Sequence, residues 1–141
     1  GNTAVTYINL DDTGLASLSG IVEAAPGLIS LHVKGNKFDA LPKEIFELGS
    51  LEALYMSNND FTGEFPIGLA NLENLVFLGC DACSLTGTLP TSIGSLDSLE
   101  ALSLFGNSMH GTIPTEFMLL TNLKHLDLAV QTNSGGEGFS G

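Results

Sequence analysis

The most constraining feature of this sequence is a leucine pattern that recurs every 23 or 24 residues. A fixed period of this length indicates a repeat protein, in which each unit is one supersecondary element stacked on the next. Because one unit cannot bury its apolar side alone, we expect a single domain over residues 1–141 with one continuous core. The clearest blocks are LISLHVKGNKF, LEALYMSNNDF, LVFLGCDACSL, LEALSLFGNSM and LKHLDLAVQTN; they begin at residues 28, 51, 75, 99 and 123, after a weaker copy, VTYINLDDTGL, that begins at residue 5.

Composition is consistent with a folded domain and excludes several partners. Of the 141 residues, 43% are hydrophobic, which argues against disorder. No apolar run reaches the roughly 20 residues that span a bilayer, so we expect no direct membrane insertion by this segment. Four basic residues stand against sixteen acidic ones, giving a net charge of −12. This balance disfavours nucleic acid and anionic membrane surfaces as partners.

Each unit predicts a short strand followed by a turn and a short helical segment. The L-x-x-L-x-L core alternates with period two, as a half-buried strand does, and successive strands would pair in a parallel sheet. A glycine and then a proline follow in the units FTGEFP, LTGTLP and MHGTIP. Proline suits the first turn of a helix, and apolar residues three apart, such as Ile93 and Leu96, fit a helical or 3-10 turn. We therefore expect an α/β repeat solenoid with its sheet on one face and short helical or 3-10 segments on the other.

The combined pattern, L-x-x-L-x-L-x-x-N/C-x-L followed by L-x-G-x-I-P, resembles the plant-type leucine-rich repeats. These repeats occur in the ectodomains of receptor-like kinases and receptor-like proteins and in polygalacturonase-inhibiting proteins. The match is good over residues 51–123, whereas FDALPKEIFELGS lacks the glycine and looks like the shorter LPxxI type. The resemblance implies a right-handed coil with a parallel β-sheet on a concave face, and a general role in binding.

Both cysteines lie in the segment GCDAC, as a C-x-x-C pair that could serve redox chemistry or form half of a zinc site. Aligned repeats favour another interpretation. Cys80 shares its column with Leu10, Val33, Met56, Leu104 and Leu128, and is expected to be a core residue. The resemblance implies that Cys83 belongs to an inward ladder that hydrogen-bonds turn backbone, with Asn36, Asn59 and Asn107. We expect both cysteines to be buried and reduced.

The strand side chains outside the core are expected to face the concave side. Tyr55, Phe77 and Phe105 lie on three consecutive coils, and exposed aromatic residues contribute strongly when a partner buries them. The predicted partner-binding patch consists of Tyr55, Phe77, Phe105, His32, Lys34 and Asp81. Two alternatives stay open: these surface aromatic residues are scattered without function, or the phenylalanines contact a neighbouring coil or a partner subunit.

Catalytic signals are missing from the sequence. It contains no G-x-x-x-x-G-K, G-x-S-x-G or H-E-x-x-H motif, and we expect no enzyme activity, catalytic residue, cofactor or metal site. The favoured function is a non-catalytic scaffold that recognises a protein, peptide or glycan. The alternative is a structural or accessory subunit held in a larger multi-protein assembly.

The sequence also bears on the compartment of the protein and on its place in a longer solenoid. The resemblance implies an extracellular or cell-surface location, whereas the lack of an N-x-[ST] site and the expected unpaired cysteines keep an intracellular or organellar setting open. We also expect the chain to be a segment of a longer solenoid. In this interpretation Phe139–Gly141 opens another L-x-G-x-I-P element, delayed by a glycine-rich insertion.

Overall fold

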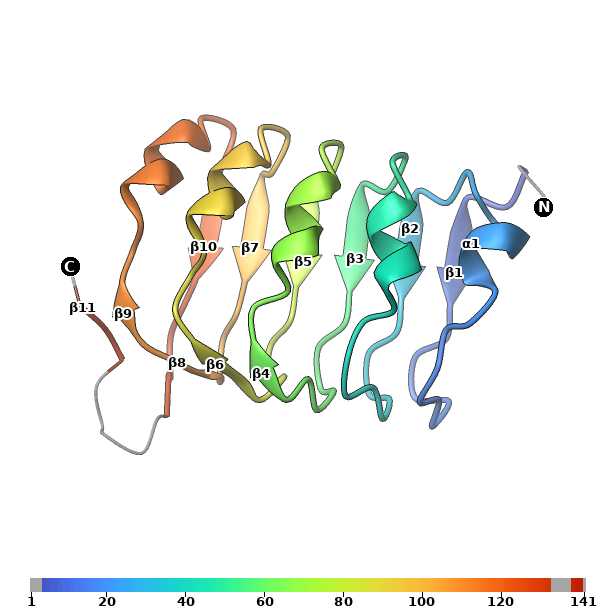
Figure 1. The fold of residues 1–141 in the computed structure, drawn as a ribbon, viewed down its shortest axis with the longest axis horizontal. Helices are drawn as coiled ribbons and strands as arrows, with labels where there is room; N and C mark the ends of the chain where they lie inside the picture. The colour runs from blue at the N-terminus through green and yellow to red at the C-terminus, as the bar shows by residue number, and fades with distance from the viewer. Residues whose placement is uncertain (1–3, 133–137, 141) are drawn as a thin grey trace.

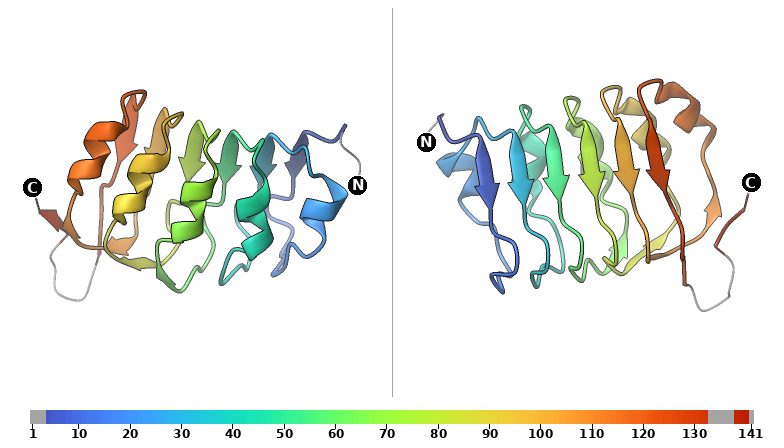
Figure 2. Two further views of the ribbon diagram at one scale, coloured as in Figure 1. Left: turned by 45° about the horizontal axis from the view of Figure 1, so that its top comes forward. Right: turned by 180° about the vertical axis from the view of Figure 1, so that it is seen from behind.

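A parallel sheet of six short strands forms one face of the molecule. The computed structural model describes residues 4–132 and 138–140. Its main sheet has the order β1-β2-β3-β5-β7-β10, so each coil places its strand beside the next (Figure 1 and the right view of Figure 2). This arrangement confirms the predicted leucine-rich repeat solenoid. The strands are β1 (Tyr7–Asn9), β2 (Ser30–His32), β3 (Ala53–Tyr55), β5 (Phe77–Gly79), β7 (Ala101–Ser103) and β10 (His125–Asp127).

Short helical segments cover the opposite face, with one in each of the first five coils (Figure 1). The first is a single α-helical turn, α1 (Ile21–Ala24), and the others are 3-10 helices that each begin directly after a proline. Neighbouring helices pack closely, because the Phe46 ring lies where Gly68 has no side chain. The 3-10 helices are η1 (Lys43–Glu47), η2 (Ile67–Asn71), η3 (Thr91–Ser95) and η4 (Thr115–Leu119).

A second set of strands, which the repeat analysis did not predict, runs along one edge of the coils. β4 (Gly63–Glu64), β6 (Leu85–Gly87) and β8 (Ser108–Met109) form a three-stranded sheet, and β9 (Gly111–Thr112) pairs with β11 (Phe139–Ser140). Gly63, Gly87 and Gly111 have φ of +111°, +73° and +90°, so the glycine of L-x-G-x-I-P adopts a backbone conformation that other residues rarely tolerate.

The register of these edge strands repeats from coil to coil. Leu85 pairs with Gly63, and Met109 pairs with Gly87. Phe139 pairs with Gly111 in the same way and packs against the core. Phe139 therefore occupies the position that Leu85 and Met109 hold in earlier coils. The glycine-rich insertion proposed before it falls largely on residues 133–137, outside the described residues.

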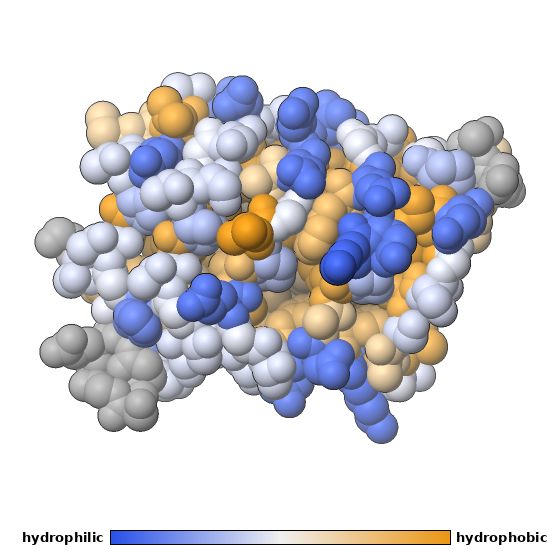
Figure 3. Space-filling view, viewed as in Figure 1, coloured by the Kyte–Doolittle hydropathy of each residue, from blue (hydrophilic) through white to orange (hydrophobic). Residues whose placement is uncertain are grey.

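The core fills the space between the sheet and the helical segments. The strand leucines Leu31, Leu54, Leu78 and Leu102 are buried there at 0–1% exposure, whereas the helix-bearing face is largely polar with scattered apolar residues (Figure 3). Within residues 4–132 and 138–140, no helix is long and apolar enough to cross a membrane.

Side-chain amides line the inside of the turns that follow the strands. Asn107 is fully buried; its amide nitrogen donates to the Cys80 and Leu104 carbonyls, and its oxygen accepts from the Cys83 and Leu85 backbone N–H groups. Asn36 and Asn59 make similar bonds, each joining its own coil to the coil before it. Gln131 takes this position in the last coil and donates to the Leu104 carbonyl at 2.9 Å.

The cysteines depart from the expected pattern, because Cys80 and Cys83 form a disulfide. Both are buried as expected, at 0% exposure, but the expectation that they are reduced is wrong. Their Cα atoms are 5.6 Å apart, inside the usual range of about 4.4–6.8 Å for a disulfide. Comparison of columns between coils missed this bond, because the two columns also face each other within one coil.

The disulfide changes what Cys83 can contribute at the ladder position. Its sulfur lies 3.3 Å from the Met56 carbonyl oxygen but, once oxidised, has no proton to donate. Cys83 therefore joins its turn to β5 covalently where asparagine uses hydrogen bonds. Complete burial also disfavours dithiol redox chemistry, since such sites need an accessible thiolate.

Candidate ligand-binding face

The exposed surface of the main sheet is organised in columns. Strand pairing aligns Tyr7, Ser30, Ala53, Phe77, Ala101 and His125 in a first column, and Asn9, His32, Tyr55, Gly79, Ser103 and Asp127 in a second. A third column follows just beyond the strands and includes Lys34, Asp81 and Phe105. Backbone hydrogen bonds between successive coils keep these positions level.

Four rings of the first two columns form a continuous stack. His32 and Tyr55 are stacked with ring centroids 4.1 Å apart, and Tyr55 and Phe77 with centroids 4.3 Å apart. Tyr7 extends the row, tilted by 60° against His32 at 5.1 Å. The strand spacing of about 4.8 Å brings neighbouring rings into contact range and so creates this ring stack of Tyr7, His32, Tyr55 and Phe77.

Gly79 determines how Phe77 joins the ring stack. Phe77 belongs to the first column, whereas Tyr55 belongs to the second, so the Phe77 ring must lean across its own strand. A Cβ atom at Gly79 would lie 3.0 and 3.1 Å from two carbons of that ring. The missing side chain therefore leaves the space that the Phe77 ring fills beside Tyr55.

The rest of the predicted patch is not drawn into the ring stack. Phe105 is 42% exposed, and among the described residues no ring contact involves it. Asp81 accepts hydrogen bonds from the Ser103 hydroxyl and from the Phe105 backbone N–H. Lys34 has an exposed side chain, and its backbone N–H donates to Asp11. Of the six predicted patch residues, the structure thus brings only His32, Tyr55 and Phe77 into ring-to-ring contact. Asp81 and Phe105 lie further along the sheet, and the Lys34 side chain is exposed to solvent.

His32 connects the ring stack to the polar residues of the first coils. Its Nδ1 lies 3.9 Å from an Asp11 carboxylate oxygen, and its Nε2 lies 3.2 Å from the Ser30 hydroxyl. These contacts hold the imidazole plane against Tyr55, so the ring stack is fixed by polar as well as aromatic neighbours.

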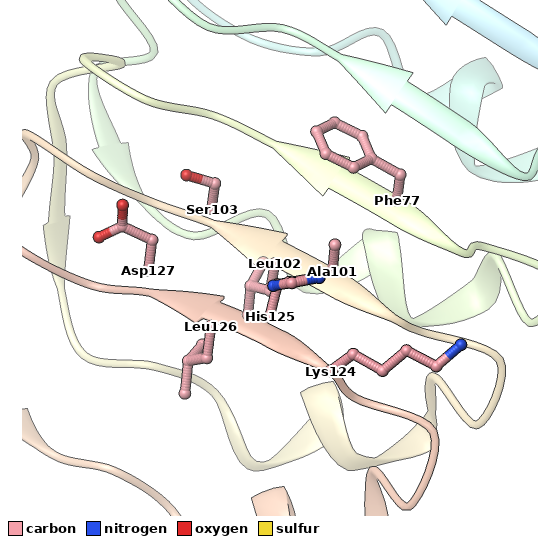
Figure 4. A pocket seen from close by; sticks show the side chains of 8 residues that line it. All are labelled: Phe77, Ala101, Leu102, Ser103, Lys124, His125, Leu126 and Asp127. Atoms are coloured by element: carbon pink, nitrogen blue, oxygen red, sulfur yellow. The ribbon is translucent and has the colours of Figure 1, made fainter.

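A shallow hollow opens where the ring stack ends (Figure 4). Ala101 of β7 lies at its centre, between Phe77 of β5 and His125 of β10; Ser103 and Asp127 lie toward one end and Lys124 toward the other. The hollow exists because β7 presents only small side chains between two strands that carry rings. We call it the β7 hollow, lined by Phe77, Ala101, Leu102, Ser103, Lys124, His125, Leu126 and Asp127.

Charges at the two ends of the β7 hollow differ in how they are paired. Lys124 Nζ lies 2.8 Å from a Glu100 carboxylate oxygen, so a neighbouring acid compensates the positive charge. Asp127 is exposed, and one of its oxygens accepts from the Ala129 backbone N–H. In the described part of the chain, no group of three or more His, Cys, Asp or Glu residues could hold a metal ion.

Tyr7, Lys124, His125 and Asp127 lie outside the partner-binding patch predicted from the sequence. Tyr7, His125 and Asp127 stand in the concave columns, so their general location could be read from the repeats. Their association with the ring stack or with the β7 hollow could not be predicted from the repeats, because it depends on side-chain direction and on the small size of Ala101.

Comparisons with known proteins place this architecture in context. The family described as "Leucine-rich repeat region" matches residues 22–138. Comparison with curated protein sequences gives no match. Among solved structures, a plant peptide hormone receptor, RGFR1 in complex with RGF2, is 33% identical with a TM-score of 0.68; the match covers 72% of this chain and 16% of the receptor chain.

Two further structures from Arabidopsis are similar. The ectodomain of the receptor kinase GASSHO1/SCHENGEN3, in complex with CASPARIAN STRIP INTEGRITY FACTOR 2, is 31% identical with a TM-score of 0.75, covering 82% of this chain and 14% of that one. The receptor kinase HAESA, in complex with the peptide hormone IDA and the co-receptor SERK1, is 28% identical with a TM-score of 0.77, covering 90% and 22%. The chain therefore spans less than a quarter of the length of each of these three relatives.

Proposed function

Because this chain belongs to the leucine-rich repeat family, we propose that it is a non-catalytic recognition scaffold that binds a peptide or protein on its concave face. Three similar structures are complexes with RGF2, CASPARIAN STRIP INTEGRITY FACTOR 2 and IDA, and the last also contains a co-receptor. Folds of this kind are typically surfaces for binding rather than catalytic centres.

The observation that carries this proposal is the ring stack on an otherwise polar and small-residue sheet. Tyr7 is 55% exposed, and Tyr55 and Phe77 are partly exposed although each packs against a neighbouring ring. Rings that are already held in place lose little conformational freedom when a partner covers their edges, which favours binding.

We propose an extracellular or cell-surface location for the protein. The relatives named above are receptors and receptor kinases, one of them represented by its ectodomain. The Cys80–Cys83 disulfide supports the same compartment, because disulfides persist in oxidising environments. Because both cysteines are bonded to each other, the expectation of unpaired cysteines no longer argues against secretion.

Matched baits test the binding proposal. Three baits would be immobilised and exposed to extracellular extract from the native source. They are the wild-type chain, a concave-face variant (the concave variant) with Tyr55→Ala and Phe105→Ala, and a control on the helix-bearing face, Ile67→Ala. A ligand retained by the wild type and the control, but lost from the concave variant, supports the proposal. Equal retention by all three baits contradicts it. Of the predicted aromatic positions, the energetically central one should cost roughly 2 kcal/mol of binding free energy when replaced by alanine.

A structural or accessory role is the second candidate, because large apolar side chains are exposed on the helix-bearing face. Ile67 is 70% exposed and Met118 is 84% exposed. In this case the Ile67→Ala bait, rather than the concave variant, would lose its partner.

A further inference from the structure

We propose that the β7 hollow receives an arginine side chain of the ligand, whose guanidinium group inserts between Phe77 and His125 and faces Asp127. This inference rests on the proposed function and names the chemistry that the concave face recognises. It comes from the point where the ring stack is interrupted, because Ala101 follows Phe77 in the first column.

The ring stack offers a free aromatic face at this position. One face of Phe77 packs on Tyr55, with a ring-plane angle of 25°. Phe77 also lines the hollow over Ala101, so its opposite face borders that hollow (Figure 4). A planar group placed there would continue the row of rings by one member.

The width of the β7 hollow suits one planar group. Phe77 and His125 stand on strands separated by β7, which is two strand spacings or about 9.5 Å. A flat group in contact on both sides needs about 7–8 Å between the two rings, since carbon atoms approach to about 3.5–4.0 Å. Strands this far apart leave room for one guanidinium plane between their side chains, whereas two stacked planes between two rings would need more than the strand separation.

Charge selects arginine over a neutral ring. Asp127 borders the hollow with an exposed carboxylate, while the Lys124 charge is compensated by Glu100 at 2.8 Å. The whole chain carries a net charge of −12, which attracts cationic ligands. A guanidinium group stacks on aromatic faces and donates to carboxylates through a planar fork, whereas the lysine ammonium is compact and strongly hydrated.

A titration with small probes tests the proposal directly. N-acetyl-arginine methylamide would be added to the ¹⁵N-labelled 141-residue chain, with the lysine, citrulline and phenylalanine derivatives as comparators. Citrulline keeps the planar shape of arginine without its charge, and lysine keeps the charge without the planar shape. We expect saturable shifts at Phe77, Ala101 and Asp127, with a Kd for the arginine probe at least about fivefold lower than for each comparator.

Each other outcome overturns the inference. Equal affinity for arginine and lysine would mean that charge alone attracts the probe, and equal affinity for citrulline would remove the role of Asp127. Tighter binding of phenylalanine would make the hollow an aromatic site. Shifts spread over the surface, or none at the three named residues, would show that the hollow is not a binding site.

Two variants connect the probe to the geometry. Asp127→Asn keeps an oxygen that can accept from Ala129 but removes the charge, and Ala101→Phe fills the hollow. Both should weaken arginine binding about fivefold or more, whereas Asp60→Asn, an equal charge change at an exposed position outside the hollow, should leave it unchanged. Unaltered binding in both variants, with their folds verified by circular dichroism, contradicts the proposal.

These tests separate failure of the inference from failure of the proposed function. The bait experiment uses Tyr55 and Phe105, which do not line the β7 hollow. If the concave variant loses its ligand while the arginine probe does not bind in the β7 hollow, the concave face binds a ligand without using an arginine there.

Discussion

At the scale of single residues, buried amides compensate for the backbone groups that each turn leaves unpaired. Asn107 is 0% exposed and makes four hydrogen bonds with backbone groups of two successive coils. A buried polar group that loses its partner costs about 1–3 kcal/mol, so even a few such amides contribute substantially to the stability of the fold. Only a side chain that both donates and accepts can bridge carbonyls and N–H groups at the same time.

We therefore predict that Asn107→Leu lowers the free energy of unfolding by at least about 1–3 kcal/mol, because it leaves buried backbone groups unpaired. Urea denaturation measures the change. Asn122→Leu is the matched control, since Asn122 is exposed and makes one hydrogen bond, to the Asp97 carbonyl. Equal midpoints for Asn107→Leu and the wild type would contradict the role of the buried amide.

The disulfide gives a second prediction at this scale. Because Cys80 and Cys83 are bonded and fully buried, native protein should not react with iodoacetamide, either before or after brief exposure to a mild reductant. Two alkylated cysteines should be found by mass spectrometry only after reduction in denaturant. Labelling of untreated, denatured protein would show instead that the thiols are free.

At the scale of structural elements, β5 shows how one glycine arranges its neighbours. The Phe77 ring occupies the space above Gly79, and this position brings it onto Tyr55. Gly79 does not have the positive φ of the turn glycines. Glycine matters at this position because it leaves room for the Phe77 ring, and not because the backbone conformation requires it.

We predict that Gly79→Val displaces the Phe77 ring and breaks its contact with Tyr55 while the coil keeps its fold. The Cβ alone would lie 3.0 Å from the ring, closer than ordinary packing permits. The measurement is the aromatic NMR spectrum, in which Tyr55 and Phe77 should lose mutual ring-current shifts. Gly49→Ala, where a Cβ meets nothing within 4 Å, should leave those signals unchanged. Unchanged signals in Gly79→Val would show that Gly79 does not position the ring.

The elements also show what the sequence can and cannot predict. The leucine columns predicted the strand register, with Leu31 beside Leu54 and Leu54 beside Leu78, because a slip would expose the apolar side of a coil. The edge strands β4, β6 and β8 were missed, since their two- or three-residue pairings leave no alternating pattern. The disulfide was missed because it joins two columns within a single coil.

The concave face was less predictable for a physical reason. Core positions must be apolar, so their columns repeat, whereas concave positions are not limited by packing and vary freely between coils. His125 and Asp127 therefore carried no signal beyond their column. The ring stack and the β7 hollow depend on Gly79 and Ala101, whose small size became informative only with their neighbours in place.

At the scale of the whole molecule, burial changes along the solenoid. Leu54, Leu78 and Leu102 are between 0% and 1% exposed in the inner coils, but their counterpart Leu126 is 42% exposed. Leu119, at the end of η4 in the preceding coil, is 58% exposed. The earlier inner coils are covered on both sides by their neighbours, whereas these two C-terminal coils present apolar side chains to solvent.

This difference predicts self-association of the 141-residue chain through its two C-terminal coils. Met118 and Leu119 are 84% and 58% exposed, and burying them against a second molecule would remove apolar surface from water. We expect the sedimentation coefficient to rise with protein concentration for the wild type, and to rise much less for the double variant Met118→Lys, Leu119→Lys. Ile67→Lys is the matched control, because Ile67 is 70% exposed on η2, away from these two coils, and its replacement should leave the concentration dependence intact. Net negative charge opposes association, so added salt should strengthen it by screening the repulsion between molecules. A wild-type chain that stays monomeric at all concentrations and salt levels, or an equal response of the double variant and the wild type, would show that the exposed apolar residues of η4 do not drive association.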